Sequence, residues 1–251
     1  MIALRSLAFN VYFFALTAAY LLGLWVLLPF PRPVFRDVVR TWQRLVFWGL
    51  RVLCGLTWEV RGGERIPAGR AVFACKHQSA WETMAFYALV ADPAYVLKKE
   101  LTRIPFWGWY VRKNRQIVVD RKAGMRALKD IAARARDVLA DGRQVVIFPQ
   151  GTRVPPPGGQ KDKPPGTSKP YQPGVYAIYA DTDAPVFPVA LNSGLFWGRR
   201  SFCKHPGTVT VEILDPMPPG MERKPFTAEL ERCIEAASDR LAAEARARFF
   251  S

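Results

Sequence analysis

The N-terminal segment of the chain carries no charge from Ser6 to Pro31. Its apolar run over residues 7–30 exceeds the roughly 20 residues that a helix needs to cross the hydrocarbon core of a bilayer. The run is too long for a signal peptide, and it ends without a small-residue cleavage site. A buried core helix is the alternative, which the length disfavours. The segment therefore predicts a membrane-associated helix, which either spans the bilayer or dips into it and returns.

A second helix is predicted over residues 37–57. Four arginines fall within one narrow arc of it: Arg36, Arg40, Arg44 and Arg51. Aromatic and aliphatic residues occupy its other faces, which suits a helix lying among lipid headgroups. An ordinary amphipathic helix with a solvated charged face is the alternative, and the preceding apolar segment favours the membrane. Basic residues after that segment predict that the rest of the chain lies on the cytoplasmic face of the inner membrane.

The chain is strongly basic, with a net charge of +15 and a sequence pI of about 10.1. Its partner is therefore expected to be anionic: a membrane surface, a phosphorylated ligand or nucleic acid. No nucleic-acid recognition motif occurs, and the apolar N-terminal segment disfavours that class. The four cysteines show no paired spacing and no zinc or redox signature, which predicts free thiols in the cytosol and no metal site.

Short apolar strands alternate with amphipathic helices over residues 58–214. Strands are predicted within residues 59–69 and over residues 72–75, 94–99, 116–121, 144–148, 185–190 and 208–214. Helices are predicted over residues 124–140, from residue 174 to near residue 180, and over residues 226–249. This order predicts an α/β fold with a mixed, mostly parallel sheet flanked by helices. We therefore expect membrane-associated helices at residues 1–57 and an α/β domain at residues 58–251.

Residues 72–82 begin as a strand and end in a polar turn that opens a helix. His77 lies where the strand gives way to the turn, and Glu82 follows about one helical turn into the next element. A ligand at the carboxyl end of a strand would contact both side chains. The only other histidine is His205, so a base that works near neutral pH has few candidates. Taken alone, His77 also suits a hydrogen-bonded core histidine, and Glu82 suits a capping box begun by Ser79.

His77-x-x-x-x-Glu82 resembles the HX4D/E motif of the glycerolipid acyltransferases, the family that includes 1-acylglycerol-3-phosphate acyltransferase. Three further segments resemble the family's later motifs and follow in its order: residues 116–121, ending in Asp-Arg; residues 148–153, Phe-Pro-Gln-Gly-Thr-Arg; and residues 185–190, Pro-Val-Phe-Pro-Val-Ala. Each segment alone also suits an ordinary strand or strand end. The resemblance covers nearly all of residues 58–194, and four motifs in order are specific. It implies that residues 58–251 form an acyltransferase domain.

The resemblance implies transfer of a fatty acyl group from an acyl thioester to the sn-2 hydroxyl of 1-acylglycerol 3-phosphate (lysophosphatidic acid), which gives phosphatidic acid. Acyl-CoA and acyl-carrier protein both stay open as donors, and no cofactor is needed. An alcohol needs a base to take its proton, a role for His77, while Glu82 holds the other ring nitrogen. A thioester already has a good leaving group, so neither Cys75 nor Ser79 is assigned as a nucleophile.

Substrate-binding residues follow from the other motifs. In the family, the arginine that ends the second motif contacts the phosphate of the acceptor, which implies that role for Arg121. Gly151 lets the backbone approach the ligand closely, Thr152 offers a hydroxyl, and Arg153 offers a second phosphate contact. Lys99, at the end of a predicted strand, is expected to add a further positive charge.

Gln150 stands where the family usually has glutamate. The amide keeps hydrogen bonds but removes a charge, so a role that needs a carboxylate, such as an ion pair with Arg153, is not expected from it. Residues 154–173 are rich in Pro, Gly and Lys and predict a mobile surface loop, with a lid as the alternative.

Two other functions compete. An acyltransferase for another lysolipid, such as lyso-ornithine lipid, would share the His-Glu pair, but its acceptor has no phosphate for two arginines to bind. A non-catalytic protein that binds membrane surfaces would explain the charge and the amphipathic helices. It would not explain why the four motifs occur in the order of the acyltransferase family.

Overall fold

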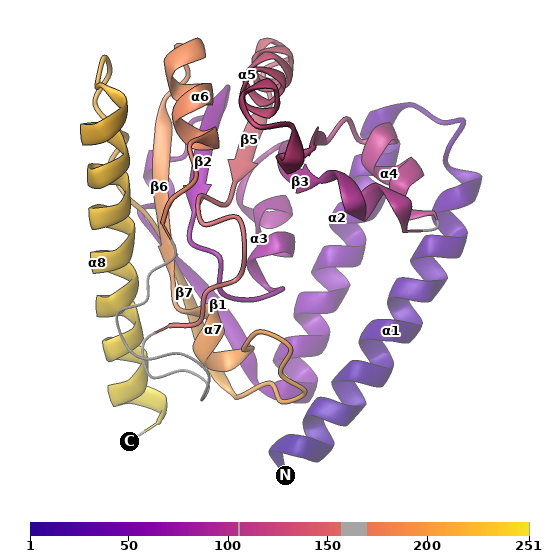
Figure 1. The fold of residues 1–251 in the computed structure, drawn as a ribbon. Coiled ribbons are helices and arrows are strands. Elements are labelled where there is room, and N and C mark those ends of the chain that lie inside the picture. Colours follow the sequence, from indigo (N-terminus) through magenta and orange to yellow (C-terminus); the bar gives the residue numbers. More distant parts are fainter. Residues whose placement is uncertain (105, 157–169, 251) are drawn as a thin grey trace.

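The computed structural model describes residues 1–104, 106–156 and 170–250 (Figure 1). Of the predicted loop at residues 154–173, residues 157–169 lie outside the described part of the chain. Within the described residues, seven strands form one sheet in the order β1-β7-β6-β2-β5-β3-β4. The strands are β1 (Leu56–Arg61), β2 (Ala71–Cys75), β3 (Pro93–Lys98), β4 (Ile117–Val119), β5 (Gln144–Ile147), β6 (Val186–Leu191) and β7 (Gly207–Ile213).

The sheet is parallel except at one pairing, between β6 and β7. Strands β2 to β6 run in one direction, and β1 and β7 pair in parallel with each other at the edge. The predicted mixed, mostly parallel sheet is therefore confirmed. Because five strands point the same way, the segments that follow them meet along a single edge.

Helices cover both faces of the sheet. They are α1 (Ile2–Val26), α2 (Arg32–Gly49), α3 (Glu82–Leu89), α4 (Trp107–Lys113), α5 (Met125–Ala140), α6 (Gly174–Asp181), α7 (Ser193–Phe196) and α8 (Arg223–Phe249). Side chains of a strand alternate between faces. Phe73 and Cys75 pack in the core cluster with α1, α2 and α3, whereas Val72 and Ala74 pack with α5, α6 and α8. Figure 1 shows the resulting three layers.

The two N-terminal helices pack against each other and against the α/β domain. Tyr12 donates to the Leu45 carbonyl at 2.9 Å, and a Cβ built on Gly49 would meet the Tyr12 ring at 2.4 Å. Phe9 and Phe47 belong to the same core cluster as the sheet. Residues 1–57 therefore share a core with the rest of the chain.

The second predicted helix, over residues 37–57, ends earlier than expected. Helix α2 stops at Gly49, a π-helical turn follows over Leu50–Cys54, and β1 has begun by Leu56. Gly55 adopts φ +67°, a left-handed conformation that commonly ends helices and that glycine adopts without strain. The predicted boundary between residues 57 and 58 thus falls inside β1.

Two arginines of the predicted arc, Arg36 and Arg40, make contacts inside the protein. Arg40 donates to the carbonyls of Tyr87 and Val90, at the end of α3, and Arg36 lies near Asp92. The last carbonyls of a helix have no partner within it, and a guanidinium satisfies them. Arg44 and Arg51 are exposed, so only part of the predicted basic stripe faces outward.

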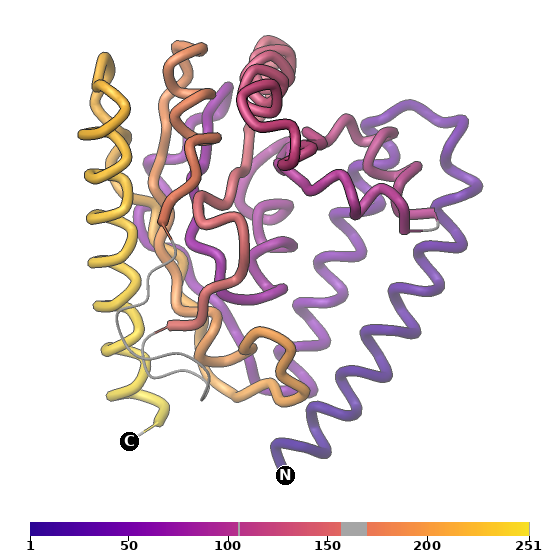
Figure 2. Tube along the Cα trace, in the orientation of Figure 1, coloured from indigo at the N-terminus to yellow at the C-terminus, as the bar shows by residue number. Residues whose placement is uncertain are grey.

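Helix α1 is long and apolar enough to cross a membrane, judged by length and composition. It forms the outer layer of the molecule, with α2 between it and the sheet (Figure 2). Large apolar side chains are exposed along it: Leu4, Leu7, Val11, Phe14, Leu22, Trp25 and Val26. This surface agrees with the predicted membrane association of the N-terminal segment.

Candidate active site

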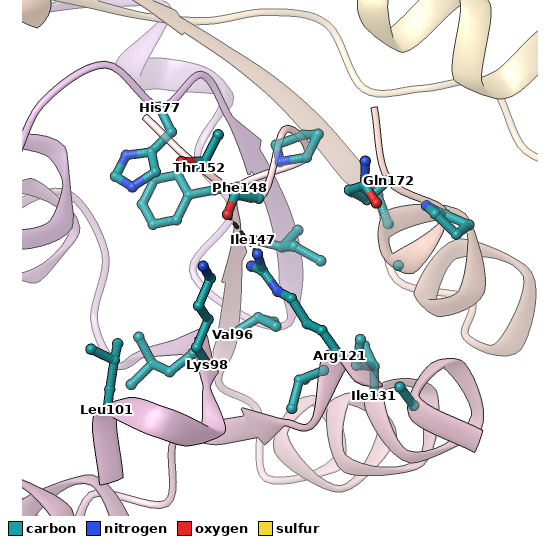
Figure 3. Close-up of a pocket in the computed structure, with 18 of the residues that line it drawn as sticks. His77, Val96, Lys98, Leu101, Arg121, Ile131, Ile147, Phe148, Thr152 and Gln172 are labelled. Carbon is teal, nitrogen blue, oxygen red and sulfur yellow. Dashed lines mark hydrogen bonds between the residues drawn. The ribbon is translucent and has the colours of Figure 1, made fainter. Parts of the chain in front are cut away.

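The predicted site residues follow the carboxyl ends of the parallel strands, where α/β sheets hold ligands. A cavity of about 910 Å³ opens there, and Figure 3 shows side chains from several strands converging on it. Its lining includes His77, Lys98, Arg121, Gly151, Thr152 and Arg153. None of the described lining residues is acidic, whereas several are arginine or lysine. The cavity is therefore suited to an anionic ligand.

His77 and Glu82 are in direct contact. His77 Nδ1 lies 2.7 Å from Glu82 Oε1, and the Glu82 side chain is fully buried. The same oxygen accepts the backbone N–H groups of Gln78 and Ser79 at 2.7 and 2.6 Å. A carboxylate oxygen that accepts these bonds is an acceptor for the imidazole as well, so Nδ1 carries a hydrogen, and the lone pair of the neutral imidazole is then on Nε2.

Glu82 contacts His77 and also makes one of the two hydrogen bonds of the predicted capping box. Its bond from the Ser79 N–H is the backbone half of the predicted capping box, although α3 begins at Glu82 itself with Trp81 as the N-cap. Its second oxygen accepts the hydroxyl of Ser193, just after β6, at 2.7 Å. The carboxylate is thus held from two directions, which fixes the plane in which it meets His77.

Phe148 orients the imidazole from the other side. Its ring stacks on His77 with centroids 4.1 Å apart and planes 20° from parallel. His77 is only 12% exposed by side chain. Packed between a ring and a fixed carboxylate, the imidazole keeps one orientation at the edge of the cavity. The second histidine, His205, instead has its ring 6.0 Å from that of Phe250.

Arg121 and Gly151 are in direct contact. Arg121 Nη1 donates to the Gly151 carbonyl at 2.6 Å (Figure 3). Gly151 has φ +65°, and a Cβ at this position would lie 2.9 Å from Arg121 Nη1. A side chain would therefore both strain the backbone and displace the guanidinium. Burial lowers the pKa of Arg121, which the charge of Glu100 partly opposes, but an arginine remains cationic at neutral pH.

Arg153 and Thr152 complete the loop after β5. Burial lowers the pKa of the Arg153 guanidinium, and the nearby Glu82 carboxylate opposes this shift. Arg199 donates to the Arg153 carbonyl at 3.4 Å and, with Arg200, adds positive charge to the cavity wall. The structure therefore brings the predicted residues Arg121, Gly151, Thr152 and Arg153 to one cavity with His77.

Lys99, the remaining predicted substrate-binding residue, does not line this cavity. Its Nζ is 3.1 Å from Asp120 Oδ2, and more than half of the side chain is exposed. Lys98 lines the cavity instead (Figure 3). Strand β3 ends at Lys98, and a 3-10 turn over Lys99–Arg103 carries the next side chain away. We therefore assign Lys98, not Lys99, to the site.

Gln150 points away from the cavity. It is buried, and its Nε2 lies 3.3 Å from an oxygen of Glu235 on α8. The neutral side chain thus donates to a carboxylate.

Two side chains near His77 are unsuited to covalent catalysis. Cys75 is fully buried, and burial raises the pKa of its thiol, with the charge of Glu82 adding to the shift. Ser79 is also fully buried, and its Oγ accepts the Trp81 N–H at 3.2 Å. Neither side chain opens to the cavity, which fits direct transfer without an acyl-enzyme.

A second, apolar cavity of about 330 Å³ adjoins the first. The two share the lining residues Thr83, Leu97 and Phe148. Its other walls come from α1, α2, α3, β3 and α4, and include Leu21, Leu24, Val39, Met84, Tyr95 and Tyr110. His77 stacks on Phe148, so the imidazole lies at the junction of a cationic and an apolar cavity.

Several site residues do not appear among the sequence predictions: Phe148, Ser193, Lys98, Arg199 and Arg200. Ser193 follows the predicted strand 185–190 closely, and a polar residue at a strand's carboxyl end is a usable signal. Phe148 is the first residue of the third motif, but the sequence predicts no role for it. Arg199 and Arg200 lie in an irregular segment with no pattern to identify them.

Comparison with known proteins agrees with this geometry. Residues 57–192 match the model of the acyltransferase family. A 1-acyl-sn-glycerol-3-phosphate acyltransferase of Pseudomonas aeruginosa is 37% identical over 210 residues, which cover 84% of this chain and 78% of that protein. One from Cocos nucifera is 26% identical over 198 residues, covering 76% and 59%. The crystal structure of the LPA acyltransferase PlsC from Thermotoga maritima shares the fold, with a TM-score of 0.72 and 22% identity over 97% of this chain and 98% of that one. The chain therefore belongs to the acyltransferase family.

Proposed function

We propose that the chain transfers a fatty acyl group from an acyl thioester to the sn-2 hydroxyl of 1-acylglycerol 3-phosphate and so forms phosphatidic acid. One observation carries this proposal: the His77–Glu82 pair lies where a cavity lined by arginine and lysine meets an apolar cavity. Such a junction suits an acceptor with an anionic head and a donor with a long apolar chain.

His77 acts as the general base. Its Nε2 takes the proton of the acceptor hydroxyl as that oxygen attacks the thioester carbonyl. The tetrahedral intermediate then collapses, the carbon–sulfur bond breaks, and the imidazolium returns the proton to the departing sulfur. Glu82 holds Nδ1–H throughout and stabilises the imidazolium while the charge is present.

The cations of the first cavity hold the acceptor. Guanidinium groups bind phosphate oxygens through parallel N–H donors, so Arg121 and Arg153 suit the phosphate, and Lys98 adds a point charge. Fixing the phosphate converts the encounter of hydroxyl and base into a positioned reaction.

The apolar cavity takes part of the acyl chain. It is walled by α1 and α2 as well as by the domain, and α1 presents an apolar surface on its outer side. We place the enzyme on the cytoplasmic face of the inner membrane, bound to its anionic surface. Acyl-CoA and acyl-carrier protein both offer the thioester that the reaction needs.

The test is an assay of the purified full chain against several acceptors and both donors. The acceptors are 1-acylglycerol 3-phosphate, lyso-ornithine lipid and other lysophospholipids, and His77→Ala is the paired variant. We expect acylation of 1-acylglycerol 3-phosphate above the other acceptors. We also expect His77→Ala to reduce turnover by about 10²- to 10⁴-fold without changing thermal unfolding, since that is the contribution of a positioned base.

Two results would overturn the proposal. Near-normal turnover by His77→Ala would remove the imidazole from the mechanism. A clear preference for lyso-ornithine lipid would assign the cations of the cavity to a head other than phosphate.

A further inference from the structure

Lys76, directly before His77, is a buried cation. Its side chain is 4% exposed, and its Nζ lies 2.6 and 2.5 Å from the two carboxylate oxygens of Glu235 on α8. A buried ammonium is costly unless an opposite charge and hydrogen bonds compensate it. The C-terminal helix therefore supplies the counter-charge for the residue next to the candidate base.

The same carboxylate contacts two other segments that border the active-site cavity. Glu235 Oε1 accepts the Tyr171 hydroxyl at 2.8 Å and the Gln150 Nε2 amide at 3.3 Å. Gln150 lies between Pro149 and Gly151, which line the cavity. Tyr171 precedes another lining residue, Gln172, whose N–H donates to the Pro149 carbonyl at 2.8 Å. Glu235 thus joins the ends of β2 and β5 and the segment before α6.

The amide at position 150 matches this arrangement. Gln150 is 1% exposed, its Nε2 faces the carboxylate, and its Oε1 has no hydrogen-bond partner among the described residues. The Gln150 amide thus gives the Glu235 carboxylate a hydrogen-bond donor, which a carboxylate side chain could not do. A glutamate at position 150 would place a second carboxylate beside that of Glu235, where the Gln150 amide now lies 3.3 Å away, and like charges at that distance repel.

We propose that Glu235 is a positioning residue that supplies, from α8, the carboxylate that the third motif usually carries at position 150. Its charge compensates Lys76, and its bonds to Gln150 and Tyr171 hold the His77 segment and the Arg153 loop in register. Without it, Lys76 loses its hydrogen-bonded counter-charge, and the His77 turn and the loop lose the carboxylate that links them. This inference rests on the proposed acyl transfer.

The test is a charge swap. Glu235→Gln removes the carboxylate, Gln150→Glu adds a second one, and the double variant exchanges amide and carboxylate. We expect each single variant to lower kcat by about 10- to 100-fold, as small misplacements of a catalytic group do. We expect the double variant to recover to within about threefold of the original enzyme, because coupled sites are strongly non-additive. Glu229→Gln, which removes an acid from the exposed face of α8, should leave kcat unchanged.

Two further measurements separate positioning from loss of fold. Lys76→Met with Glu235→Gln leaves no unpaired ammonium, so it should fold and exceed Glu235→Gln alone in kcat. Thermal unfolding of each variant gives its folded fraction, by which kcat is corrected.

The proposal is overturned if the double swap is as inactive as the product of the two single effects. It is also overturned if Glu235→Gln has unchanged kcat. These outcomes are distinct from failure of the proposed function, in which the original enzyme would not acylate 1-acylglycerol 3-phosphate. The swap is then measured with the acceptor that the panel identifies.

Discussion

The Arg121 guanidinium combines a structural contact with the phosphate-binding role that we propose for it. One of its N–H groups is engaged by the Gly151 carbonyl at 2.6 Å, which fixes the group at the cavity wall. A guanidinium has five N–H donors, so others remain for an anion. The contact with the Gly151 carbonyl is partly buried, and a charge-assisted hydrogen bond is stronger there than in water.

Arg121→Ala should raise the KM for 1-acylglycerol 3-phosphate by about 10- to 100-fold, because a hydrogen bond to a charged group contributes about 1.5–3 kcal/mol. The KM for the acyl donor should change little. Steady-state kinetics with each substrate varied in turn measures both values. Arg126→Ala, an exposed arginine on α5, is the matched control. Equal increases in the two KM values would contradict the phosphate assignment.

At the scale of single residues, the sequence predicts contacts between residues that are close together in the chain. His77 and Glu82 are five residues apart, so one strand end and one turn determine their contact. Ser193 reaches the same carboxylate from 111 residues away, and no local pattern encodes that distance. Lys98 and Lys99 show a second limit of prediction from sequence. The strand ends one residue earlier than predicted, at Lys98, so Lys98 rather than Lys99 faces the cavity.

At the scale of elements, Asp92 connects α2 to the sheet. Its carboxylate forms a two-bond pair with Arg32 at 2.9 and 2.6 Å, and Arg143 Nε at the start of β5 lies 3.2 Å away. Burial alone would raise the pKa of Asp92, but the Arg32 hydrogen bond and the charges of Arg143, Arg32 and Arg36 outweigh it. The net pKa is below the usual 3.8. The cluster therefore stabilises the fold only while the carboxylate is ionised.

Asp92→Asn should lower the free energy of unfolding at neutral pH by about 3 kcal/mol, because it leaves the buried Arg143 and the partly buried Arg32 without their counter-charge. A depressed folded pKa gives stability that is complete above the unfolded pKa and is lost as pH falls through the folded one. The difference between the original protein and the variant should therefore shrink below about pH 4. Denaturant unfolding at a series of pH values measures it, and a difference independent of pH would exclude the ionised carboxylate as the cause.

The existence of most elements follows from periodicity, but their partners do not. The alternating strands and the helices at residues 124–140 and 226–249 appear close to their predicted positions. The order β1-β7-β6-β2-β5-β3-β4 depends on contacts between distant segments, which a single sequence does not display. The arginines of α2 illustrate this, since their spacing suits headgroups as well as the carbonyls at the end of α3.

At the scale of the whole molecule, α1 forms hydrogen bonds with the rest of the chain at several points along its length. Near its start, Ser6 Oγ accepts the backbone N–H of Lys204 at 2.9 Å, and Asn10 Oδ1 accepts its ammonium. Further along, Thr17 accepts the Trp42 indole at 3.3 Å, and the Leu21 carbonyl accepts the Tyr110 hydroxyl. A spanning helix would carry the buried Lys204 and its loop toward hydrocarbon, which is costly for a charge. We therefore expect α1 to lie within one leaflet, with its exposed apolar side facing lipid.

This arrangement predicts that both ends of α1 are reached from the same side of the membrane. Single cysteines at exposed Ala3 and Phe30, in a chain whose partly exposed Cys203 and Cys233 are replaced by serine, report the two ends. In inverted membrane vesicles an impermeant maleimide should label both, and in right-side-out vesicles neither, because we propose that the α/β domain lies on the cytoplasmic side. Labelling of one end in each type of vesicle would show that α1 spans the bilayer. The contacts of Lys204 with Ser6 and Asn10 would then have to break when the protein enters the membrane.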